Sequence, residues 1–253
     1  MNDSSSSTSS STPSSTPRAQ SLPSLSQPFK ALVLGSTGTL GSAFVQALQD
    51  CEGCSQVVTV SRTSHAGFAL ESEESIAQAA AEEKSKGPYS IIVDATGALT
   101  IDGKGPEKRL AALNAAQLAR AFEVNAIGRA LILKHFIELL PRQGRCLFAV
   151  LSARVGSLSD NKLGGWYGYR ASKAAGNMLL QTAAVESHRT RPDAVFVAMQ
   201  PGTVPSKLSA PFQSGHTTVS ATDAVAGLLK VINELEARPQ AWFIDYQGGL
   251  IDW

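Results

Sequence analysis

From residue 29 onwards, short apolar runs alternate with longer segments of helical periodicity, and this alternation constrains the fold more than any other feature of the chain. The apolar runs are typical of buried strands and fall at 31–34, 57–60, 67–70, 91–93, 146–151, 195–199 and 242–244. The helical segments fall at 40–48, 74–84, 110–140, 169–188 and 221–235. Strands that alternate with helices are joined by crossover connections, which place the strands parallel in one sheet. We therefore predict an α/β fold, a single doubly wound parallel sheet of about seven strands with helices on both faces.

The size and charge of the chain limit its partners. Its 253 residues, 43% of them hydrophobic, suffice for one sizeable core, so we expect one domain. The formal net charge is +1 and the basic residues are scattered, which argues against nucleic acid or an anionic membrane surface as a partner. No apolar run approaches the roughly 18 residues that a membrane span requires. We expect a small polar ligand, no nucleic acid and no membrane.

Residues 1–28 are dominated by Ser, Thr and Pro and contain almost no large apolar side chains. Such a composition cannot repay the entropy of ordering, so we predict a disordered tail at 1–28 and a folded domain at 29–253. The only acid of the tail is Asp3, which leaves open a transit peptide for a plastid or mitochondrion. The tail has a single arginine, however, and lacks the amphipathic pattern of such peptides. The odd count of three cysteines fits a reducing compartment, and we expect a cytoplasmic protein unless the tail directs it to an organelle.

Cys51 and Cys54 form a CxxC pair. Two functional interpretations are a redox pair and half of a zinc site, but no second CxxC and no suitably spaced histidines complete a set of four ligands. We favour a loop between a helix and a strand that happens to hold two thiols, and we predict no metal site.

Three glycines, Gly35, Gly38 and Gly41, follow the first predicted strand and open the first predicted helix. Glycines at such a junction allow a tight turn and let the backbone approach a pyrophosphate, whose charge then meets the free N–H groups of the helix N-terminus. This context is that of a Rossmann-type dinucleotide site. We predict that the pyrophosphate binds at Gly35, Ser36, Thr37, Gly38, Leu40 and Gly41.

The end of the second predicted strand indicates which nicotinamide cofactor binds. NAD sites place an acidic residue about 20 residues past the glycines, where it holds the ribose 2′-hydroxyl and would repel a 2′-phosphate. This chain has Ser61 and Arg62 there instead. A guanidinium suits a phosphate by its charge and its forked donors, and the Ser61 hydroxyl adds another donor. We predict that NADP(H) binds with its 2′-phosphate at Ser61 and Arg62.

Tyr169 and Lys173 stand four residues apart in a predicted helix, so both lie on one helix face. A phenol with a pKa near 10 exchanges protons poorly at neutral pH, but a nearby ammonium stabilises the phenolate and lowers that pKa. A Tyr and a Lys together on an exposed helix are common, but that interpretation does not explain their place downstream of a cofactor turn. The pair predicts an acid/base site beside the cofactor.

Residues 29–253 resemble the short-chain dehydrogenase/reductase family, whose YxxxK motif is matched by residues 169–173. The stretches 152–157 and 165–170 are similar to the branch that contains C-factor-like proteins and sniffer-type carbonyl reductases. In combination these motifs are specific for the family.

The resemblance implies a role for each matched position. Tyr169 is expected to be the acid/base that protonates the carbonyl oxygen as hydride arrives, while Lys173 holds the nicotinamide ribose and tunes the tyrosine. Asn125 is expected to help keep a proton-relay water in place. The resemblance further implies contacts to the adenosine side from Ala95, Thr96 and Gly97, and to the nicotinamide amide from Pro201, Gly202 and Val204.

Three positions depart from the family pattern. The glycines run GxxGxxG where members usually show GxxxGxG, so Thr39 stands where a glycine is expected. Ser206 replaces a threonine that contacts the carboxamide, and a hydroxyl is retained. Ala153 occupies the place of the substrate-polarising serine, and such a preorganised donor is worth roughly 3 to 4 kcal/mol. We favour Ser152 as its replacement, which requires the strand end to bend because neighbouring residues point to opposite faces, and keep Ser157 as the alternate.

The leading hypothesis is an NADPH-dependent reductase, or the reverse dehydrogenase, that transfers hydride between the nicotinamide and a ketone or aldehyde. Its substrate would be a small carbonyl or alcohol compound, and residues 204–218 are interpreted as a lid over the site or as a surface loop. The alternative is an NADP-binding regulatory or signalling protein with little turnover, which Ala153 favours. The resemblance also implies a homodimer or a homotetramer that packs through the helices carrying Asn125 and Tyr169.

Overall fold

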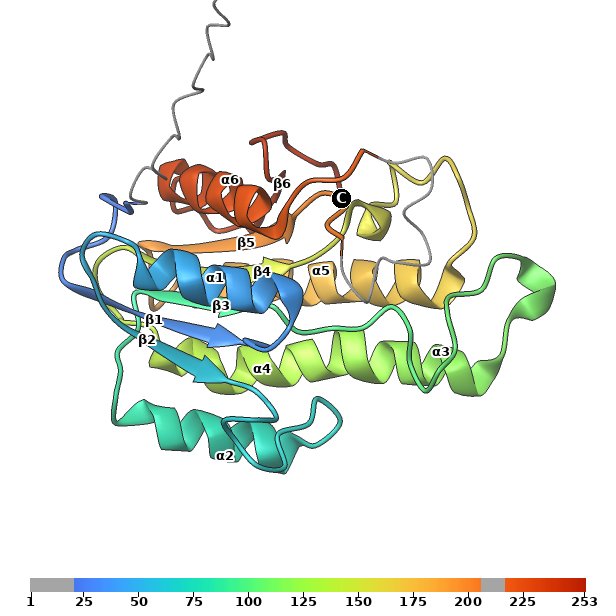
Figure 1. Cartoon of the computed structure of the whole chain (residues 1–253), viewed down its shortest axis with the longest axis horizontal. Coiled ribbons are helices and arrows are strands. Elements are labelled where there is room, and N and C mark those ends of the chain that lie inside the picture. The colour runs from blue at the N-terminus through green and yellow to red at the C-terminus, as the bar shows by residue number, and fades with distance from the viewer. Residues whose placement is uncertain (1–20, 206–216) are drawn as a thin grey trace, which may run out of the picture.

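The computed structural model describes residues 21–205 and 217–253. In these residues six strands form one parallel sheet in the order β2-β1-β3-β4-β5-β6 (Figure 1). The strands are β1 (Phe29–Leu34), β2 (Cys54–Val60), β3 (Ile91–Asp94), β4 (Cys146–Leu151), β5 (Ala194–Gln200) and β6 (Trp242–Asp245). The helices are α1 (Thr39–Gln49), α2 (Glu73–Lys84), α3 (Ala115–Phe122), α4 (Gly128–Phe136), α5 (Tyr167–Ser187) and α6 (Ala221–Glu234). The predicted doubly wound α/β fold is confirmed.

Helices cover both faces of the sheet, so the core has two layers (Figure 1). On one face α1 and α6 pack with Phe44 and Leu228 toward the strands. On the other face α2, α4 and α5 form the second layer, to which Ile76 belongs. Successive strand residues such as Val33 and Leu34 are both buried, one in each layer. This double burial explains why the strands are continuous apolar runs rather than alternating patterns.

The segment 67–70 does not form the strand that its sequence predicts. The described sheet has six strands, close to the predicted number of about seven. Its backbone is hydrogen-bonded locally: the N–H of Phe68 donates to the carbonyl of His65 at 3.1 Å, and the N–H of Ala69 donates to Ser75 Oγ at 3.0 Å. Phe68 is nevertheless buried in the core layer that α2 and α4 cover. One buried aromatic side chain in a turn thus accounts for the apolar pattern.

The segment 110–140 contains one continuous helical stretch. The π-helical turn Glu123–Ile127 joins α3 directly to α4, and the short 3-10 helix Leu110–Ala112 lies apart from both. The predicted soft break near Gly128 coincides with the end of this turn. A Cβ atom at Gly128 would lie 2.8 Å from Cβ and from the carbonyl oxygen of Leu70, so glycine allows the loop before α2 to approach the helix.

The folded part of the chain begins before residue 29. Leu22 and Leu25 are only 0% and 2% exposed, and both pack into the core layer that α1 and α6 cover. The N–H of Ser24 donates a hydrogen bond to Asn233 Oδ1 at 3.1 Å. The prediction of disorder is therefore corrected for residues 21–28, because two leucines among small polar residues suffice to hold the segment on the domain. Residues 1–20 lie outside the described part of the chain.

Cys51 lies in the connection between α1 and β2, and Cys54 is the first residue of β2. Cys51 and Cys54 are free, and burial raises the pKa of both thiols, that of Cys51 to about 11. Since the thiolate is the nucleophile and the metal ligand, this environment disfavours redox chemistry and metal binding at neutral pH. Within residues 21–205 and 217–253, no group of three or more His, Cys, Asp and Glu side chains is placed to hold a metal ion. No helix of the same residues is long and apolar enough to cross a membrane.

Candidate active site

A cleft of about 790 Å³ lies at the carboxyl ends of β1, β3, β4 and β5, beside the first turns of α5. It is lined by residues 37–41, 95–99, 151–155, 163, 164, 166, 169, 170, 173 and 200–204. Doubly wound sheets bind ligands at this edge, where the chain reverses the strand order. Here the reversal falls at β1, which lies between β2 and β3.

Most residues predicted from the sequence are brought together in this cleft. Those that line it are Tyr169, Lys173, Ser152, Thr37, Gly38, Leu40, Gly41, Ala95, Thr96, Gly97, Pro201, Gly202 and Val204. Those that do not are Gly35, Ser36, Ser61, Arg62, Asn125 and Ser157. Ser206 and residues 207–216 of the predicted lid lie outside the described residues.

The glycine turn is built by close packing. Gly35 has a φ of +74°, and a Cβ atom there would lie 2.9 Å from the backbone of Ala95. A Cβ atom at Gly41 would lie 2.1 Å from the carbonyl oxygen of Gly35. Gly38 differs, because the nearest atom to its missing Cβ is 3.4 Å away. Gly35 and Gly41 therefore serve the turn itself, whereas Gly38 keeps an open backbone face on the cleft.

The start of α1 is suited to an anion. Gly38 is the N-terminal cap of this helix, and no side chain accepts a hydrogen bond from the N–H groups of the first turn at this cap. The first N–H groups of a helix have no acceptor within the helix and carry the positive end of its dipole. Thr39, which departs from the family pattern, is an exposed first residue of α1.

The loop after β2 lies against the glycine turn, since the N–H of Gly35 donates to the carbonyl of Val60 at 2.8 Å. Ser61 is buried there, and its hydroxyl accepts hydrogen bonds from the N–H groups of Thr63 and Ser64, both at 3.2 Å. Arg62 is exposed and forms no ion pair with the described residues. Its charge is available to a ligand at this edge.

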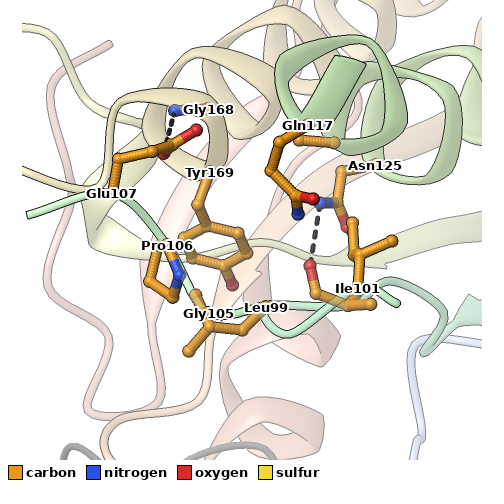
Figure 2. Close-up of a pocket in the computed structure, with 11 residues that line it drawn as sticks. Leu99, Ile101, Gly105, Pro106, Glu107, Gln117, Asn125, Gly168 and Tyr169 are labelled. Carbon is orange, nitrogen blue, oxygen red and sulfur yellow. Dashed lines mark hydrogen bonds between the residues drawn. The ribbon is translucent and has the colours of Figure 1, made fainter. Parts of the chain in front are cut away.

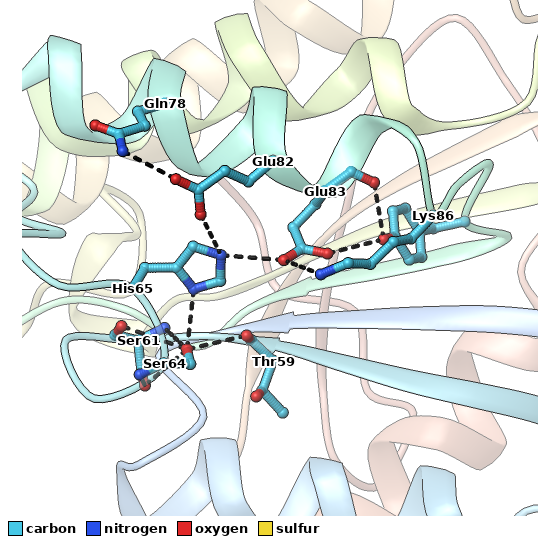
Figure 3. A network of polar contacts seen from close by, with 9 residues as sticks. Thr59, Ser61, Ser64, His65, Gln78, Glu82, Glu83 and Lys86 are labelled. Atoms are coloured by element: carbon cyan, nitrogen blue, oxygen red, sulfur yellow. Dashed lines mark hydrogen bonds and ion pairs between the residues drawn. The ribbon is translucent and has the colours of Figure 1, made fainter.

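A polar network fixes this loop on α2 (Figure 3). Ser64 Oγ accepts a hydrogen bond from the N–H of Ser61 at 2.9 Å and lies 3.0 Å from His65 Nδ1. His65 Nε2 in turn lies 3.0 Å from Oε1 of the buried Glu83. Sequence reasoning missed His65 and Glu83, because no local pattern connects two residues 18 positions apart.

Tyr169 and Lys173 lie one turn apart on α5, as predicted. Lys173 Nζ is 5.7 Å from the centroid of the Tyr169 ring and donates a hydrogen bond to the carbonyl of Leu151 at 3.3 Å. Burial raises the pKa of Tyr169 to about 12, and the charge of Arg129 opposes this rise. Burial also lowers the pKa of Lys173 well below its usual range. The expected lowering of the phenol pKa by the lysine is thus not what this geometry provides.

The N-terminus of α5 is capped by a residue that the sequence does not single out. The N–H of Gly168 donates to Oε2 of the buried Glu107 at 3.0 Å (Figure 2). Trp166 precedes the helix in the left-handed region, at a φ of +54°, and its ring meets the edge of the Tyr169 ring. Glu107 therefore joins the loop after β3 to the helix that carries Tyr169.

Asn125 lies in the π-helical turn and is almost fully buried. Its side chain forms two hydrogen bonds with Ala98, accepting from the N–H at 2.9 Å and donating to the carbonyl at 2.8 Å. Together with Glu107, Gln117 and Tyr169 it lines a cavity of about 10 Å³ (Figure 2), which is about the size that one water molecule needs. Asn125 thus fixes the loop after β3 beside a water-sized space next to Tyr169.

The two candidate serines are placed differently. Ser152 follows β4 and lines the cleft, but its hydroxyl donates a hydrogen bond to Asn177 Oδ1 at 2.6 Å. Ser157 is buried outside the cleft lining, where its Oγ accepts from the N–H of Asp160 at 3.1 Å. Ala153 lines the cleft without a polar side chain. Of the two, only Ser152 is near the space where a substrate would lie.

Comparison with known proteins identifies the family. The family model for short chain dehydrogenases matches residues 30–217. The C-signal protein of Myxococcus xanthus is 32% identical over 168 residues, which cover 66% of this chain and 94% of that protein. The 1-hydroxy-2-glutathionyl-2-methyl-3-butene dehydrogenase of Rhodococcus sp. (strain AD45) is 30% identical over 189 residues, which cover 74% and 79% of the two chains. The chain belongs to the short chain dehydrogenase family, and the resemblance stated from its motifs is confirmed.

Solved structures share the fold. The NADPH-bound carbonyl reductase from chicken fatty liver superposes with a TM-score of 0.77 at 20% identity, covering 90% of this chain and 95% of that one. The carbonyl reductase Sniffer of D. melanogaster has a TM-score of 0.74 at 19% identity, and the match covers 90% of this chain and 100% of that one.

The different roles of the glycines are testable. We expect Gly41→Ala to lower the free energy of unfolding by about 1 to 3 kcal/mol, because the new methyl group would overlap the Gly35 carbonyl. Gly38→Ala should change the stability by less than about 1 kcal/mol, yet weaken NADPH binding about tenfold or more by blocking the open backbone face. Thermal unfolding and fluorescence titration with NADPH measure the two effects. If Gly38→Ala binds NADPH as tightly as the wild type, the pyrophosphate does not lie on this face.

Proposed function

We propose that this protein is an NADPH-dependent carbonyl reductase or, in the reverse direction, an alcohol dehydrogenase acting on a ketone, an aldehyde or the corresponding alcohol. The observation that carries the proposal is the position of Tyr169 and Lys173 in the same cleft as the glycine turn. A dinucleotide held at the start of α1 and a proton donor on α5 would then share one cavity. The Rhodococcus relative, a dehydrogenase by name, supports the same reaction class.

The residues of the cleft, together with Ser61 and Arg62 on the loop after β2, suit NADP(H). The uncapped start of α1 and the open face of Gly38 would take the pyrophosphate, while Arg62 would pair with the 2′-phosphate. Described residues that line the cleft include no Asp or Glu, so no carboxylate there repels these phosphates. Ser61 would support Arg62 mainly through the turn that its hydroxyl closes. The NADPH-bound carbonyl reductase with the same fold is consistent with this choice.

NADPH, when bound, supplies hydride to a carbonyl carbon. Tyr169 donates its phenol proton to the carbonyl oxygen, and solvent protons reach the phenol through the small cavity that it shares with Asn125. Lys173 orients the nicotinamide ribose. Ser152 would donate a hydrogen bond to the oxygen on which negative charge develops, in place of the serine absent at 153, once its single O–H turns from Asn177 Oδ1 toward the substrate.

Assembly through α5 is part of the proposal. Met178 and Val185, seven residues apart on one face of this helix, are 65% and 43% exposed. A second copy of the chain would cover these apolar side chains, as the resemblance implies for a homodimer or a homotetramer.

The acid/base role of Tyr169 is tested by following NADPH oxidation over a panel of ketones and aldehydes. We expect Tyr169→Phe to reduce turnover about 10²- to 10⁴-fold, the usual contribution of a positioned proton donor, with the affinity for NADPH unchanged. If NADPH binds but no compound gives turnover that depends on Tyr169, the enzyme proposal fails. The regulatory or signalling alternative would then be the better interpretation of Ala153.

The hydroxyl that replaces the family serine is identified by two matched variants. Ser152→Ala should lower kcat/KM about 10²- to 10³-fold, the loss typical of one oxyanion donor, whereas Ser157→Ala should leave kcat/KM near the wild-type value. Steady-state kinetics on one carbonyl substrate measure both. The opposite ranking would assign the role to Ser157.

Cofactor choice depends on Arg62. Removing one charge-assisted contact to a phosphate costs about 1.5 to 3 kcal/mol, so Arg62→Ala should weaken NADPH about tenfold to a hundredfold and leave NADH nearly unchanged. Arg142→Ala, at an exposed arginine that pairs with Glu138, is the matched control. Equal losses for the two cofactors, measured by fluorescence titration, would contradict the assignment.

A further inference from the structure

A buried ion pair lies beside Lys173, and the proposed mechanism does not use it. Asp94 ends β3 and is 0% exposed, and Arg129 in α4 is 2% exposed. Arg129 Nε lies 3.6 Å from Asp94 Oδ2, and neither atom has a hydrogen-bond partner among the described residues. Removing two charges from water costs several kcal/mol per ion, so an apolar pair would serve packing as well or better. Asp94 also fixes the turn after β3, because its Oδ1 accepts hydrogen bonds from the N–H and the hydroxyl of Thr96. The buried guanidinium of Arg129 has no such role in a turn.

Arg129 shares a hydrogen-bond acceptor with the lysine of the site. Its Nη2 donates to the carbonyl oxygen of Leu151 at 2.7 Å, and Lys173 Nζ donates to the same oxygen at 3.3 Å. Leu151 is the last residue of β4 and precedes Ser152. Arg129 therefore holds both the lysine and the strand end that carries the candidate oxyanion donor.

Close packing of α4 against α5 places the guanidinium there. A Cβ atom at Gly176 would lie 3.1 Å from Arg129 Nη1 and 3.0 Å from the carbonyl oxygen of Asn125. A larger residue at 176 would displace the arginine or the π-helical turn. The position of the charge is thus fixed by three elements, β3, β4 and α5.

Arg129 is a cation near Tyr169 that keeps its positive charge. The charged groups on the elements around Tyr169 are Lys173 and Arg170 on α5, Arg129 on α4, Asp94 at the end of β3, and Glu107 in the loop after β3, which contacts the start of α5. Burial, and after it the neighbouring charge of Arg129, lowers the pKa of Lys173, which favours the neutral amine. A guanidinium keeps its proton in proteins. Arg129 therefore adds a positive charge near Tyr169 that does not depend on the protonation of Lys173.

We propose that Arg129 is a positioning residue of this active site, which holds Lys173 and the end of β4 through the Leu151 carbonyl and stabilises the phenolate form of Tyr169. The inference rests on the proposed acid/base role of Tyr169. When the phenol O–H bond breaks and the proton passes to the substrate oxygen, the negative charge left on the phenolate is offset by the guanidinium. Asp94 balances the same guanidinium while Tyr169 is neutral.

The test replaces the ion pair by a neutral pair, because Arg129→Met alone would leave Asp94 unpaired in the core. In the double variant Asp94→Asn, Arg129→Met, we expect the acid limb of kcat/KM for alcohol oxidation to move to higher pH by about one unit or more. Loss of a nearby cation disfavours the phenolate, so the reactive form appears only at higher pH. If the acid limb of the pH profile stays within about 0.3 pH units of that of the wild type, the proposal is overturned.

A second readout does not require turnover. The ultraviolet absorbance of tyrosinate is followed as the pH is raised, with NADP⁺ present. Subtracting the titration of the Tyr169→Phe variant isolates the signal of Tyr169 from that of the 4 tyrosines. At a fixed pH near 11, the double variant should show a several-fold smaller Tyr169 signal than the wild type. An equal signal would overturn the proposal even if no substrate is found.

Further variants separate charge from packing. Asp94→Asn, Arg129→Gln keeps a donor for the Leu151 carbonyl without the charge and should shift both readouts as the first double variant does, which also serves if that variant fails to fold. Arg129→Lys keeps an amine beside Asp94, but a buried ammonium gives up its proton more readily than a guanidinium, so this variant should restore both readouts only in part. The control, Glu73→Gln, Lys134→Met, removes an exposed ion pair of α2 and α4 and should shift neither readout. If Tyr169→Phe retains full turnover, the proposed function fails; an unshifted titration with Tyr169-dependent turnover contradicts only the role of Arg129.

Discussion

The close approach of the turns that follow β1 and β3 is the constraint on which the whole site depends. Parallel register puts Leu34 beside Asp94 and Asp94 beside Val150, so the ends of three strands meet in one row. Gly35 can lie against Ala95 only because it lacks a side chain. That contact brings the start of α1 next to the loop held by Asn125. Through Asp94 it also links this loop to the ion pair beside Lys173, on the helix that carries Tyr169. The part of the cleft at the glycine turn and the part at Tyr169 belong to one packed layer.

The features that were predictable from the sequence are those set by neighbouring residues. Periodicity identified the helices and strands because burial on both sides of a parallel sheet leaves continuous apolar runs. The glycine turn and the Tyr169–Lys173 pair were recognisable because each motif spans fewer than about ten residues and has one local context. The errors had a common origin. Phe68, Leu22 and Leu25 are buried by contacts with distant elements, so their local patterns indicated a strand in one case and disorder in the other.

What the sequence did not reveal are pairs of polar residues far apart in the chain. Glu107 caps a helix that begins some 60 residues later, and Ser152 is held by Asn177 from the next helix. Neither spacing corresponds to a turn of helix or a step along a strand. The direction of a hydroxyl such as that of Ser152 depends on such partners, which explains why residue order alone left the choice between Ser152 and Ser157 open. Arg129 escaped notice for a similar reason, since in sequence it is one basic residue in an amphipathic helix.

The attachment of the N-terminal segment limits how the chain can be processed. Cleavage by a protease at or before residue 20 would leave Leu22 and Leu25 on the domain. The core layer under α1 and α6 would then stay covered. Cleavage at residue 28 would remove both leucines and expose apolar surface beside Phe29, the first residue of β1. A maturation site, if the Ser- and Thr-rich segment is a targeting sequence, therefore has to fall upstream of the two leucines.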